Sequence, residues 1–532
     1  MNDVFGIVDL FSGPGGLGEG FCQLHREGEA VFEIDVSVEK DTVAHSTLQL
    51  RSFLRKFGDE LPREYLDFLN GVAPEPDWPD LYPDQWASAE TEALNLTLGD
   101  DSDNNQVGER IGEIRKKRGD RVILIGGPPC QAYSLAGRGR KPSDLGYVAH
   151  EENRHLLYEE YISVLRKLRP AAFVMENVKG MLSSSIENRM VFDLVTADLE
   201  NRGGSPEYQL FPLSAKVPEG QDVSPSDFVV LAEEQGVPQA RHRVIIVGIR
   251  RDLLKEVIGF KFPKLQGDVQ AATVRDVLSE MPKLRSGISA RDGRKDDPEA
   301  WRRTVRLAAM QIEEMPVALE GGQRERFRAA LHEISGQTTE YGKVRTGAVG
   351  GTKLSGDCPE GLRDWIQDPR LHHLSLHETR GHMPSDLGRY LFAACWASAT
   401  GNSPKAHDFP EDLAPDHANW NSGKFNDRFR VQPWDLPSST VTCHLAKDGH
   451  YFIHPDATQC RSMTVREAAR LQTFPDNYHF KGNRTQQYVQ VGNAVPPYLA
   501  YQIASVLHDA LRQLTFVDGT PTVERDKEAI PA

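Results

Sequence analysis

Cysteine is scarce in this sequence, and the few cysteines are scattered. Six of the 532 residues are cysteine, at positions 22, 130, 358, 395, 443 and 460, and no two of them form a Cys-x-x-Cys pair. Disulfide frameworks and zinc clusters both need cysteines at short, repeated spacings. The sequence supports neither arrangement, and we expect no metal site.

Long apolar runs are absent as well. No stretch of 18 consecutive apolar residues occurs, and residues 1–11 have neither a basic leader nor a cleavage signature. We therefore expect a soluble, cytoplasmic protein with no membrane partner. A chain of 532 residues is long enough for two or more domains around a sizeable core.

Positive charge is in short supply and unevenly spread. The 62 Lys and Arg residues are outnumbered by 77 Asp and Glu, which gives a net charge of −15. Residues 51–110 carry 14 acidic and 5 basic side chains, whereas residues 251–430 carry 26 acidic and 27 basic ones. A surface that binds a polyanion must therefore be local.

The N-terminal segment combines an apolar strand with a glycine-rich loop. Residues 4–11 are apolar, and the loop that follows places glycines 13, 15 and 18 in a Gly-x-Gly-x-x-Gly pattern before a predicted helix. Such a loop lets the backbone approach a nucleotide-like cofactor. The loop alone would suit a dinucleotide-dependent dehydrogenase equally well.

A second strand, at residues 32–39, ends on an acid. Glu39 lies where a ribose-binding carboxylate is expected relative to the glycines, and we favour it over Glu33 and Asp35, which lie within the strand. Asp41 is expected to cap the next helix. Residues 58–110 read as an acidic, proline-rich insertion in which only Asp100 is a candidate cofactor contact, with a solvated loop acid as the alternative.

The sequence Gly-Gly-Pro-Pro-Cys-Gln at residues 126–131 places a thiol directly after an apolar strand at 122–125. The two prolines fix φ and remove two backbone donors, which stiffens the loop. A lone cysteine is more often buried and inert. Held at the carboxyl edge of a parallel sheet, Cys130 is nevertheless placed as a nucleophile would be.

Further polar residues follow two later strands. Glu176 and Asn177 end an apolar strand that begins at residue 173, and Glu176 should share the sheet edge with Cys130. Arg241 and Arg243 alternate before a strand at 244–249, so they face one side and suit an anionic or carbonyl-rich ligand. A capping glutamate and a surface arginine pair are the alternative interpretations.

Taken together and in order, these segments resemble the C5-cytosine DNA methyltransferase family. The matching motifs are DLFSGPGG, SVEKD, GGPPCQ, RHLLYEEY, MENVKG, QGVPQARHR, PSSTVT, REAARLQTFPD and QVGNAVPP. They cover about 1–250 and 430–515. The resemblance implies an α/β fold, namely a Rossmann-like S-adenosylmethionine-dependent methyltransferase sheet with a second, smaller target-recognition domain.

The resemblance also implies a mechanism on duplex DNA. Cys130 would add to C6 of a flipped cytosine, Glu176 would contact N3 and N4, and Arg243 would hold O2. Arg241 and Gln239 would brace the loop and substrate. Asn177 would orient the proline loop. The residues implied for binding of S-adenosylmethionine are Phe11, Gly13, Gly15, Gly16, Glu39, Leu157, Asn493 and Val495.

The expected domain division follows from the motif order. It comprises a catalytic and cofactor-binding domain at 1–250, a target-recognition domain at 251–430, a returning C-terminal part at 431–515 and a flexible tail at 516–532. Two basic patches, at 291–306 and 372–389, are candidate DNA contacts together with Arg250 and Arg251.

Three other functions compete with DNA methylation. An RNA cytosine methyltransferase would share Cys130 and Glu176, but the tRNA-acting relatives carry a Cys-Phe-Thr element and lack so large a middle region. An inactive DNA-binding relative would not need to retain the complete set Cys130, Glu176 and Arg243. A nicotinamide dehydrogenase fits only the glycine loop. A DNA cytosine methyltransferase explains every motif, and we expect it to act in a restriction-modification or phage-defence setting, although the motifs themselves do not specify that setting.

Overall fold

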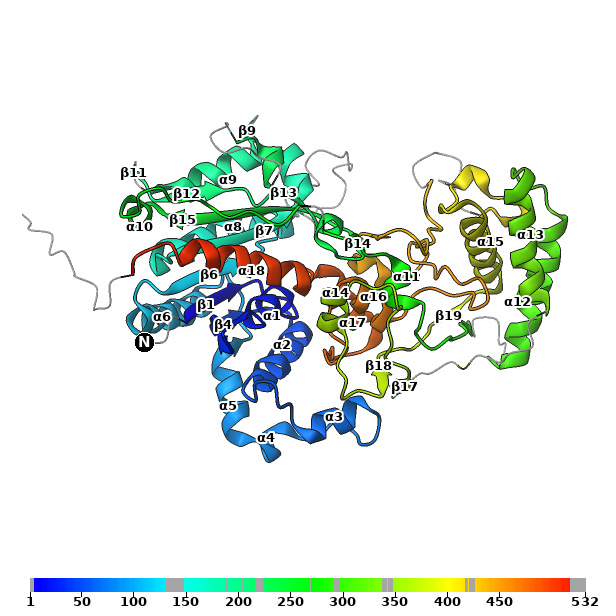
Figure 1. The fold of residues 1–532 in the computed structure, drawn as a ribbon, viewed down its shortest axis with the longest axis horizontal. Helices are drawn as coiled ribbons and strands as arrows, with labels where there is room; N and C mark the ends of the chain where they lie inside the picture. The colour runs from blue at the N-terminus through cyan, green and yellow to red at the C-terminus, as the bar shows by residue number, and fades with distance from the viewer. Residues whose placement is uncertain are drawn as a thin grey trace, which may run out of the picture.

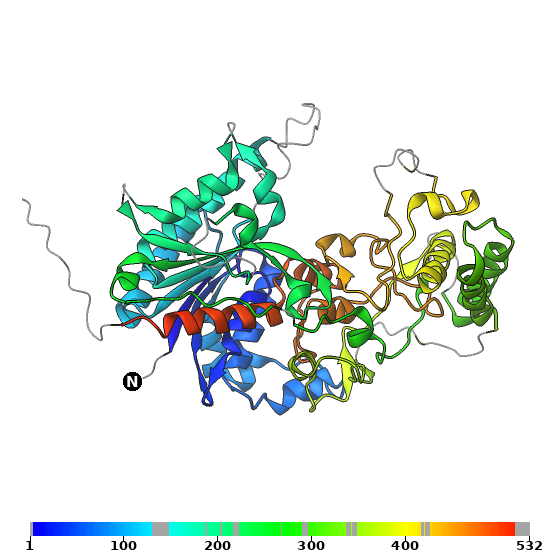
Figure 2. The ribbon, with the colours of Figure 1, turned by 45° about the horizontal axis from the view of Figure 1, so that its top comes forward.

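The structure is a computed structural model that describes most of the chain. The described residues are 4–129, 148–186, 189–202, 205–215, 223–267, 269–289, 296–336, 342, 348–416, 420 and 426–516. Within these ranges, no helix has the length and apolar character needed to cross a bilayer. Figures 1 and 2 show a large part built on a sheet and a smaller, mainly helical part at the other end.

One eight-stranded sheet forms the centre of the larger part (Figure 1). Its order is β12-β15-β7-β6-β1-β4-β5, and β13 pairs with β15 off this path. The strands are β1 (Phe5–Leu10), β4 (Phe32–Val38), β5 (Ala93–Leu94), β6 (Val122–Gly126), β7 (Ala172–Val178), β12 (Tyr208–Phe211), β13 (Val229–Leu231) and β15 (His242–Arg250). Neighbours from β5 to β7 run parallel, whereas β15 is antiparallel to β7 and β12. The predicted α/β class is confirmed.

Both faces of this sheet are covered by helices, which explains why its central strands are apolar throughout. On one face α1 (Gly16–Cys22) and α18 (Pro497–Leu511) pack against β1 and β4. On the other face lie α6 (Asp101–Arg118), α8 (Val148–Leu168) and α9 (Val191–Glu200). The last described helix, α18, thus lies against the first, α1, as Figure 1 shows.

The smaller part has its own core around three helices. These are α12 (Pro298–Glu314), α13 (Gly321–Gly336) and α15 (Pro384–Thr400), and their core also includes Val431, Ile453 and Cys460. Residues 251–287 and 354–374 pack elsewhere: Leu253 and Leu265 join the sheet core, and Leu362 joins a core with α16 (Val465–Leu471) and α17 (Arg484–Asn493). The domain division at residues 250 and 430 stays a prediction. Because these flanking segments do not join the core of the smaller part, the packing favours a second domain that is shorter than 251–430.

The region expected to be an irregular acidic insertion is helical. It contains α3 (Arg63–Leu69), α4 (Trp78–Leu81) and α5 (Pro83–Glu92), and it is followed by β5 and α6, which belong to the sheet layer. Aromatic side chains drive this local fold, because Trp78 and Tyr65 pack with Phe53 of α2 (Thr42–Arg55). The extent of about 58–110 stays a prediction, and the place of β5 and α6 in the sheet layer favours an extra element that ends near Glu92.

The extra helices also contact the chain that leads into the middle region. Asn70 accepts hydrogen bonds from the backbone N–H groups of His372 and His373, and Arg370 donates to the carbonyl of Asp59. Leu371 is buried in the aromatic core of the insertion. Helices α3 to α5 are thus part of the framework that holds residues 368–373.

Candidate active site

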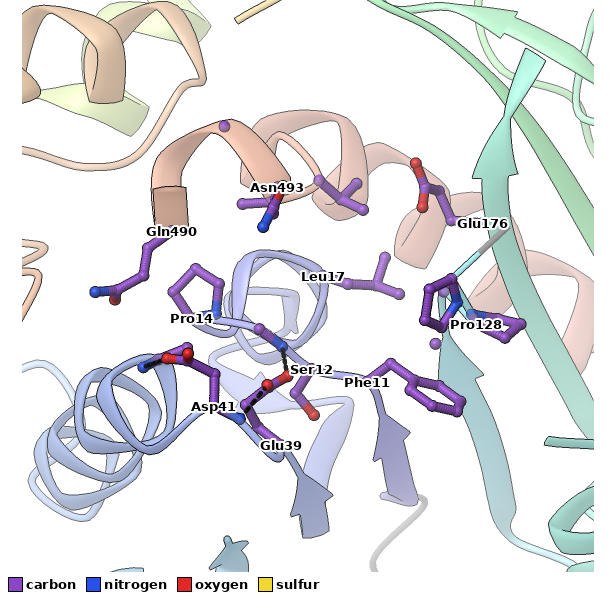
Figure 3. Close-up of a pocket in the computed structure, with 18 of the residues that line it drawn as sticks. Phe11, Ser12, Pro14, Leu17, Glu39, Asp41, Pro128, Glu176, Gln490 and Asn493 are labelled. Carbon is purple, nitrogen blue, oxygen red and sulfur yellow. Dashed lines mark hydrogen bonds between the residues drawn. The ribbon is translucent and has the colours of Figure 1, made fainter. Parts of the chain in front are cut away.

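The main cavity lies at the carboxyl edge of β1, β4, β6 and β7 (Figure 3). Its volume is about 730 Å³, a size typical of ligand sites, and α17 and residues 442–443 close one side. Ten predicted site residues line it: Phe11, Gly13, Glu39, Leu157, Glu176, Asn177, Arg241, Arg243, Asn493 and Val495. Residues from both ends of the chain therefore meet in one site.

The glycine loop turns sharply between β1 and α1. Phe11, Gly13 and Gly15 have φ of 56°, 57° and 97°, a region in which glycine is strain-free and phenylalanine is not. The Gly13 N–H donates to Glu39 Oε2 at 2.9 Å, and the Asp41 N–H donates to Glu39 Oε1 at 2.7 Å. The acid at the end of β4 thus fixes the loop that faces the cavity.

Of the three candidate ribose-binding acids, Glu39, Glu33 and Asp35, only Glu39 lines the cavity. Burial raises the pKa of Glu39. Asp35 and Glu33 are instead engaged by Arg118, at 2.8 and 2.9 Å, and neither lines the cavity. The position of Glu39 relative to Gly13 fits the ribose-binding role inferred from the sequence, which stays a prediction.

Gly15 and Gly16 serve packing rather than lining. A Cβ on Gly16 would come within 2.4 Å of the Val495 carbonyl, and one on Gly15 would come within 2.9 Å of Leu48 Cδ1. Gly16 thus lets α1 approach the segment after α17, which includes the cavity residue Val495, whereas Gly15 makes room for Leu48 of α2. Their predicted role as cofactor contacts is not supported by the lining.

Asp100 also does not line the cavity. Its carboxylate accepts hydrogen bonds from the Ser102 and Asp103 N–H groups, so it caps α6 and stays exposed. The adjoining wall is apolar instead, with Leu98 and Leu157 facing the cavity. The alternative interpretation of Asp100 as a solvated acid describes its position better.

The proline loop enters the cavity from β6. Gly126 has φ of 157°, and a Cβ there would lie 2.4 Å from the Leu10 carbonyl, so the strand can end only with a glycine at this point. Pro128 and Pro129 line the cavity, and Asn177 donates to the Pro128 carbonyl at 3.2 Å. This is the contact that the predicted orienting role requires. Cys130 lies outside the described residues.

Glu176 and Arg243 meet at the cavity from adjacent strands. Arg243 Nε lies 2.7 Å from Glu176 Oε1, as an ion pair rather than a well-aligned hydrogen bond. Their side chains are only 14% and 13% exposed, which shields the pair from solvent screening. Figure 3 shows Glu176 near Pro128, with Asn493 and Gln490 on α17. An anionic and a cationic group thus face one small region beside the proline loop.

Arg241 and Gln239 brace the walls of the site. Arg241 is 2% exposed and donates to the carbonyls of Val441 (2.9 Å) and Gly492 (3.3 Å). Burial lowers its pKa to about 9, so the guanidinium stays charged at neutral pH. Gln239 accepts from the Val441 N–H at 2.7 Å and does not line the cavity. Both residues thus contact the segment at residues 441–442, and their predicted role of bracing the loop and the substrate stays a prediction.

Several lining residues were not predicted. Thr442 is the last residue of the matched motif PSSTVT, and Cys443 is the next residue. Extending the motif by one residue would therefore have included both. Gln490 precedes the matched Asn493 by one helical turn. Asp9 begins the motif DLFSGPGG, but its position within an apolar strand gave no sign that it would reach the cavity.

The second basic patch of the middle region is largely structural. His377 and His382 are 1% and 5% exposed and contact Thr464 and Ser462. Burial lowers the pKa of His377 to about 4 and that of His382 well below its usual value, so both are neutral at pH 7. The expectation that these histidines contact DNA is wrong, because they are buried.

Other predicted DNA contacts are also placed differently. Arg380 donates to the Leu445 carbonyl, and Arg389 pairs with Asp386 at 2.9 Å. Arg250 pairs with Asp120 at the end of β15 that is remote from Glu176, because that strand is antiparallel to β7. Arg251 follows it. Residues 291–295 of the first patch lie outside the described residues. In the part of the chain that is described, no group of three His, Cys, Asp or Glu could hold a metal.

Comparison with known proteins places this geometry in a family. The family described as C-5 cytosine-specific DNA methylase matches residues 99–509. The Type II methyltransferase M.Bpa9945I of Bacillus paralicheniformis is 32% identical over 521 residues, which cover 95% of this chain and 99% of the relative. M.AgeI of Thalassovita gelatinovora, also a Type II methyltransferase, is 26% identical over 95% of this chain and 99% of its own length.

A solved structure supports the fold. It is described as a candidate DNA modification methyltransferase encoded within a prophage (E. coli), with 17% identity, a TM-score of 0.52, and coverage of 96% of this chain and 99% of the other. The family match spans most of the chain, and the 32% identity extends along nearly all of it. The chain therefore belongs to the C-5 cytosine-specific DNA methylase family and is a DNA (cytosine-5-)-methyltransferase.

Proposed function

We propose that this enzyme flips a cytosine out of duplex DNA and methylates it through a transient bond between Cys130 Sγ and C6. The observation that carries the proposal is the single cavity that joins the Glu39 glycine loop to the Glu176–Arg243 pair and the proline loop preceding Cys130. A base inside a duplex cannot enter such a cavity, so it must leave the stack.

The residues of the cavity fit S-adenosylmethionine. Phe11 and Leu157 offer apolar surface to an adenine ring, and Glu39 offers carboxylate oxygens near the ribose. Asn493 and Val495 close the opposite wall. S-adenosylmethionine bound there supplies the methyl group that C5 receives.

The chain's own groups perform the remaining steps. The Cys130 thiolate adds to C6, the C5–C6 double bond opens, and charge moves toward N3, where Glu176 donates a hydrogen bond or a proton that returns to Glu176 when C5 is methylated. Arg243 holds O2 and keeps Glu176 in position. After C5 is methylated, a base removes the C5 proton, the double bond re-forms, and the bond from C6 to sulfur breaks, which returns the thiolate.

We also propose a biological setting for the enzyme. Both curated relatives above are Type II methyltransferases. We propose that the enzyme works as a monomer in the bacterial cytoplasm, in a restriction-modification or phage-defence system, and the names of these relatives support the restriction-modification part of this proposal. In that setting it marks host DNA at one short sequence.

Bisulfite sequencing of DNA from cells that express the enzyme tests the reaction and reads the site together. Cys130→Ser should lower methylation at least about a thousandfold, because a serine hydroxyl is scarcely ionised at neutral pH. Cys22→Ser, at the far end of α1, is the control and should methylate normally. Full methylation by Cys130→Ser would contradict the covalent step, and methylation of RNA but not DNA would contradict the substrate.

A trapping experiment separates the two thiols of this region. Duplex DNA with 5-fluorocytosine at the methylated position should remain covalently bound, since fluorine cannot leave as a proton. Cys443 also lines the cavity. The adduct should survive Cys443→Ser and be lost in Cys130→Ser, and the reverse pattern would assign the nucleophile to Cys443.

A further inference from the structure

The glycine loop is held from behind by a buried tyrosine from a distant part of the chain. Pro14 lines the cavity (Figure 3), and its carbonyl accepts a hydrogen bond from the hydroxyl of Tyr478, 464 residues along the chain. Helix α1 begins at this loop with Gly15 as its N-cap, and among the described residues no side chain caps it there. The loop therefore depends on contacts from elsewhere. Glu39 holds the Gly13 N–H, and Tyr478 holds the Pro14 carbonyl.

The ring of Tyr478 is packed between aromatic and charged neighbours. Tyr478 is fully buried, and its ring centroid lies 4.8 Å from that of Phe474 and 5.3 Å from that of Phe480. The guanidinium of Arg51 in α2 lies 4.8 Å from the same centroid and also pairs with Glu19 of α1. Burial raises the pKa of Tyr478 above its usual value, so the hydroxyl keeps its proton and stays a donor. This packing keeps the hydroxyl directed at the loop.

The helices of the insertion reach this tyrosine through its neighbour, Asn477. Tyr65 of α3 is fully buried, and its hydroxyl donates to the Asn477 carbonyl at 2.7 Å. The Asn477 side chain accepts from Arg51 at 3.3 Å and donates to Asp368 at 2.8 Å. The carbonyl that Tyr65 holds belongs to the peptide unit that leads directly into Tyr478. Helix α3 therefore helps to fix the backbone of Tyr478.

Two further contacts hold the same segment against the insertion. The ring centroid of His479 lies 4.8 Å from that of Phe68 in α3, and Lys481 pairs with Glu75 in the segment between α3 and α4. Residues 477–481 are thus seated on the insertion. They lead on to α17, which closes one side of the cavity.

We propose that Tyr478 is a positioning residue for the cofactor loop, and that the insertion supports it through Tyr65 and Asn477. The inference rests on the proposed function, because it assumes that S-adenosylmethionine occupies the cavity. Neither Tyr478 nor any residue of 58–92 lines the cavity, so both act through the Pro14 carbonyl. The extra helices α3 to α5 thereby contribute to cofactor binding from outside the site.

Removal of single hydroxyl groups tests this inference, because Tyr→Phe keeps the ring and its packing. In methyl-transfer assays of the full chain on duplex DNA that carries the methylated site, Tyr478→Phe should raise the KM for S-adenosylmethionine about 3- to 10-fold, in line with one lost hydrogen bond. The kcat and the KM for DNA should stay at the wild-type values, because the groups that contact the base are unchanged. Calorimetric titration with S-adenosylhomocysteine should show the same loss of affinity.

Tyr488→Phe is the matched control. Tyr488 of α17 is equally buried, and its hydroxyl also donates to a backbone carbonyl, that of Met463 at 2.7 Å, which lies outside the glycine loop. Urea denaturation should show similar losses in the free energy of unfolding for Tyr488→Phe and Tyr478→Phe. The KM for S-adenosylmethionine should rise only in Tyr478→Phe, and an equal rise in both variants would overturn the positioning role.

A double-mutant cycle tests the link to the insertion. Tyr65→Phe alone should raise the KM for S-adenosylmethionine about 2- to 3-fold, and it should add nothing further in the Tyr478→Phe background. Additive effects, or an unchanged KM in Tyr65→Phe, would overturn the link to the insertion. An unchanged KM in Tyr478→Phe would overturn the positioning role itself. Absence of S-adenosylhomocysteine binding by wild type would instead refute the proposed cofactor site.

Discussion

Glu39 shows how one side chain can order a loop and face a ligand together. It holds the N–H groups of Gly13 and Asp41 and lines the cavity. Glu39→Ala should weaken S-adenosylmethionine binding by about 1–3 kcal/mol, because charged hydrogen bonds are lost. Glu33→Ala, which removes only the ion pair with Arg118, should leave the affinity unchanged. Calorimetry checks both, and the opposite ranking would assign the role to Glu33.

Asp9 also predicts how stability depends on pH. Burial raises its pKa from the ordinary value of 3.8 to about 7 in the folded protein, so between these pH values the folded state holds a proton that the unfolded state has lost. This group therefore reduces the free energy of unfolding as pH rises from about 4 to about 7. Asp9→Asn lacks that loss. In urea denaturation without cofactor, the free energy of unfolding of Asp9→Asn should therefore rise relative to that of wild type between about pH 4 and pH 7, by up to about 4 kcal/mol. A constant difference would contradict the raised pKa.

Among the elements, strands and caps were predictable and the insertion was not. Apolar runs predicted β1, β4, β6, β7 and β15 to within a few residues, and Asp41 caps α2 as expected. Residues 58–92 lack a long apolar period because α3 to α5 are short and bury a few large aromatics such as Trp78. Likewise, the burial of His377 depends on Thr464, 87 residues away, which no local pattern reveals.

Helix α4 offers a direct test of the insertion's core. Trp78 is 3% exposed and packs against Phe53 of α2, whereas Leu81 of the same helix is 51% exposed. Trp78→Ala should lower the free energy of unfolding by about 3–5 kcal/mol. Leu81→Ala should change it by less than about 0.5 kcal/mol. Urea denaturation measures both, and equal effects would show that the aromatic cluster does not stabilise the fold.

Across the whole molecule, a net charge of −15 must be reconciled with binding to a polyanion. Several expected cations do not supply the attraction: Arg250 is paired at the far end of β15, and Arg380 and Arg389 donate to carbonyls of the protein. Exposed lysines near the cavity remain. Lys179 follows β7 directly, and Lys447 ends the short turn that begins with Cys443. Neither has an ion pair in the described part of the chain.

We predict that these two lysines contact DNA phosphates beside the flipped base. Binding should then weaken with salt by a slope of roughly −0.9 per neutralised phosphate, and Lys179→Gln with Lys447→Gln should reduce the slope by about two such contacts. Lys255→Gln, an exposed lysine of α10 (Arg251–Lys255) beyond the remote end of β15, should leave it unchanged. Fluorescence anisotropy on duplex DNA at several salt concentrations measures the slope. If the double variant kept the wild-type slope while Lys255→Gln lowered it, the phosphate-binding surface would lie at the opposite end of the sheet, away from the catalytic cavity.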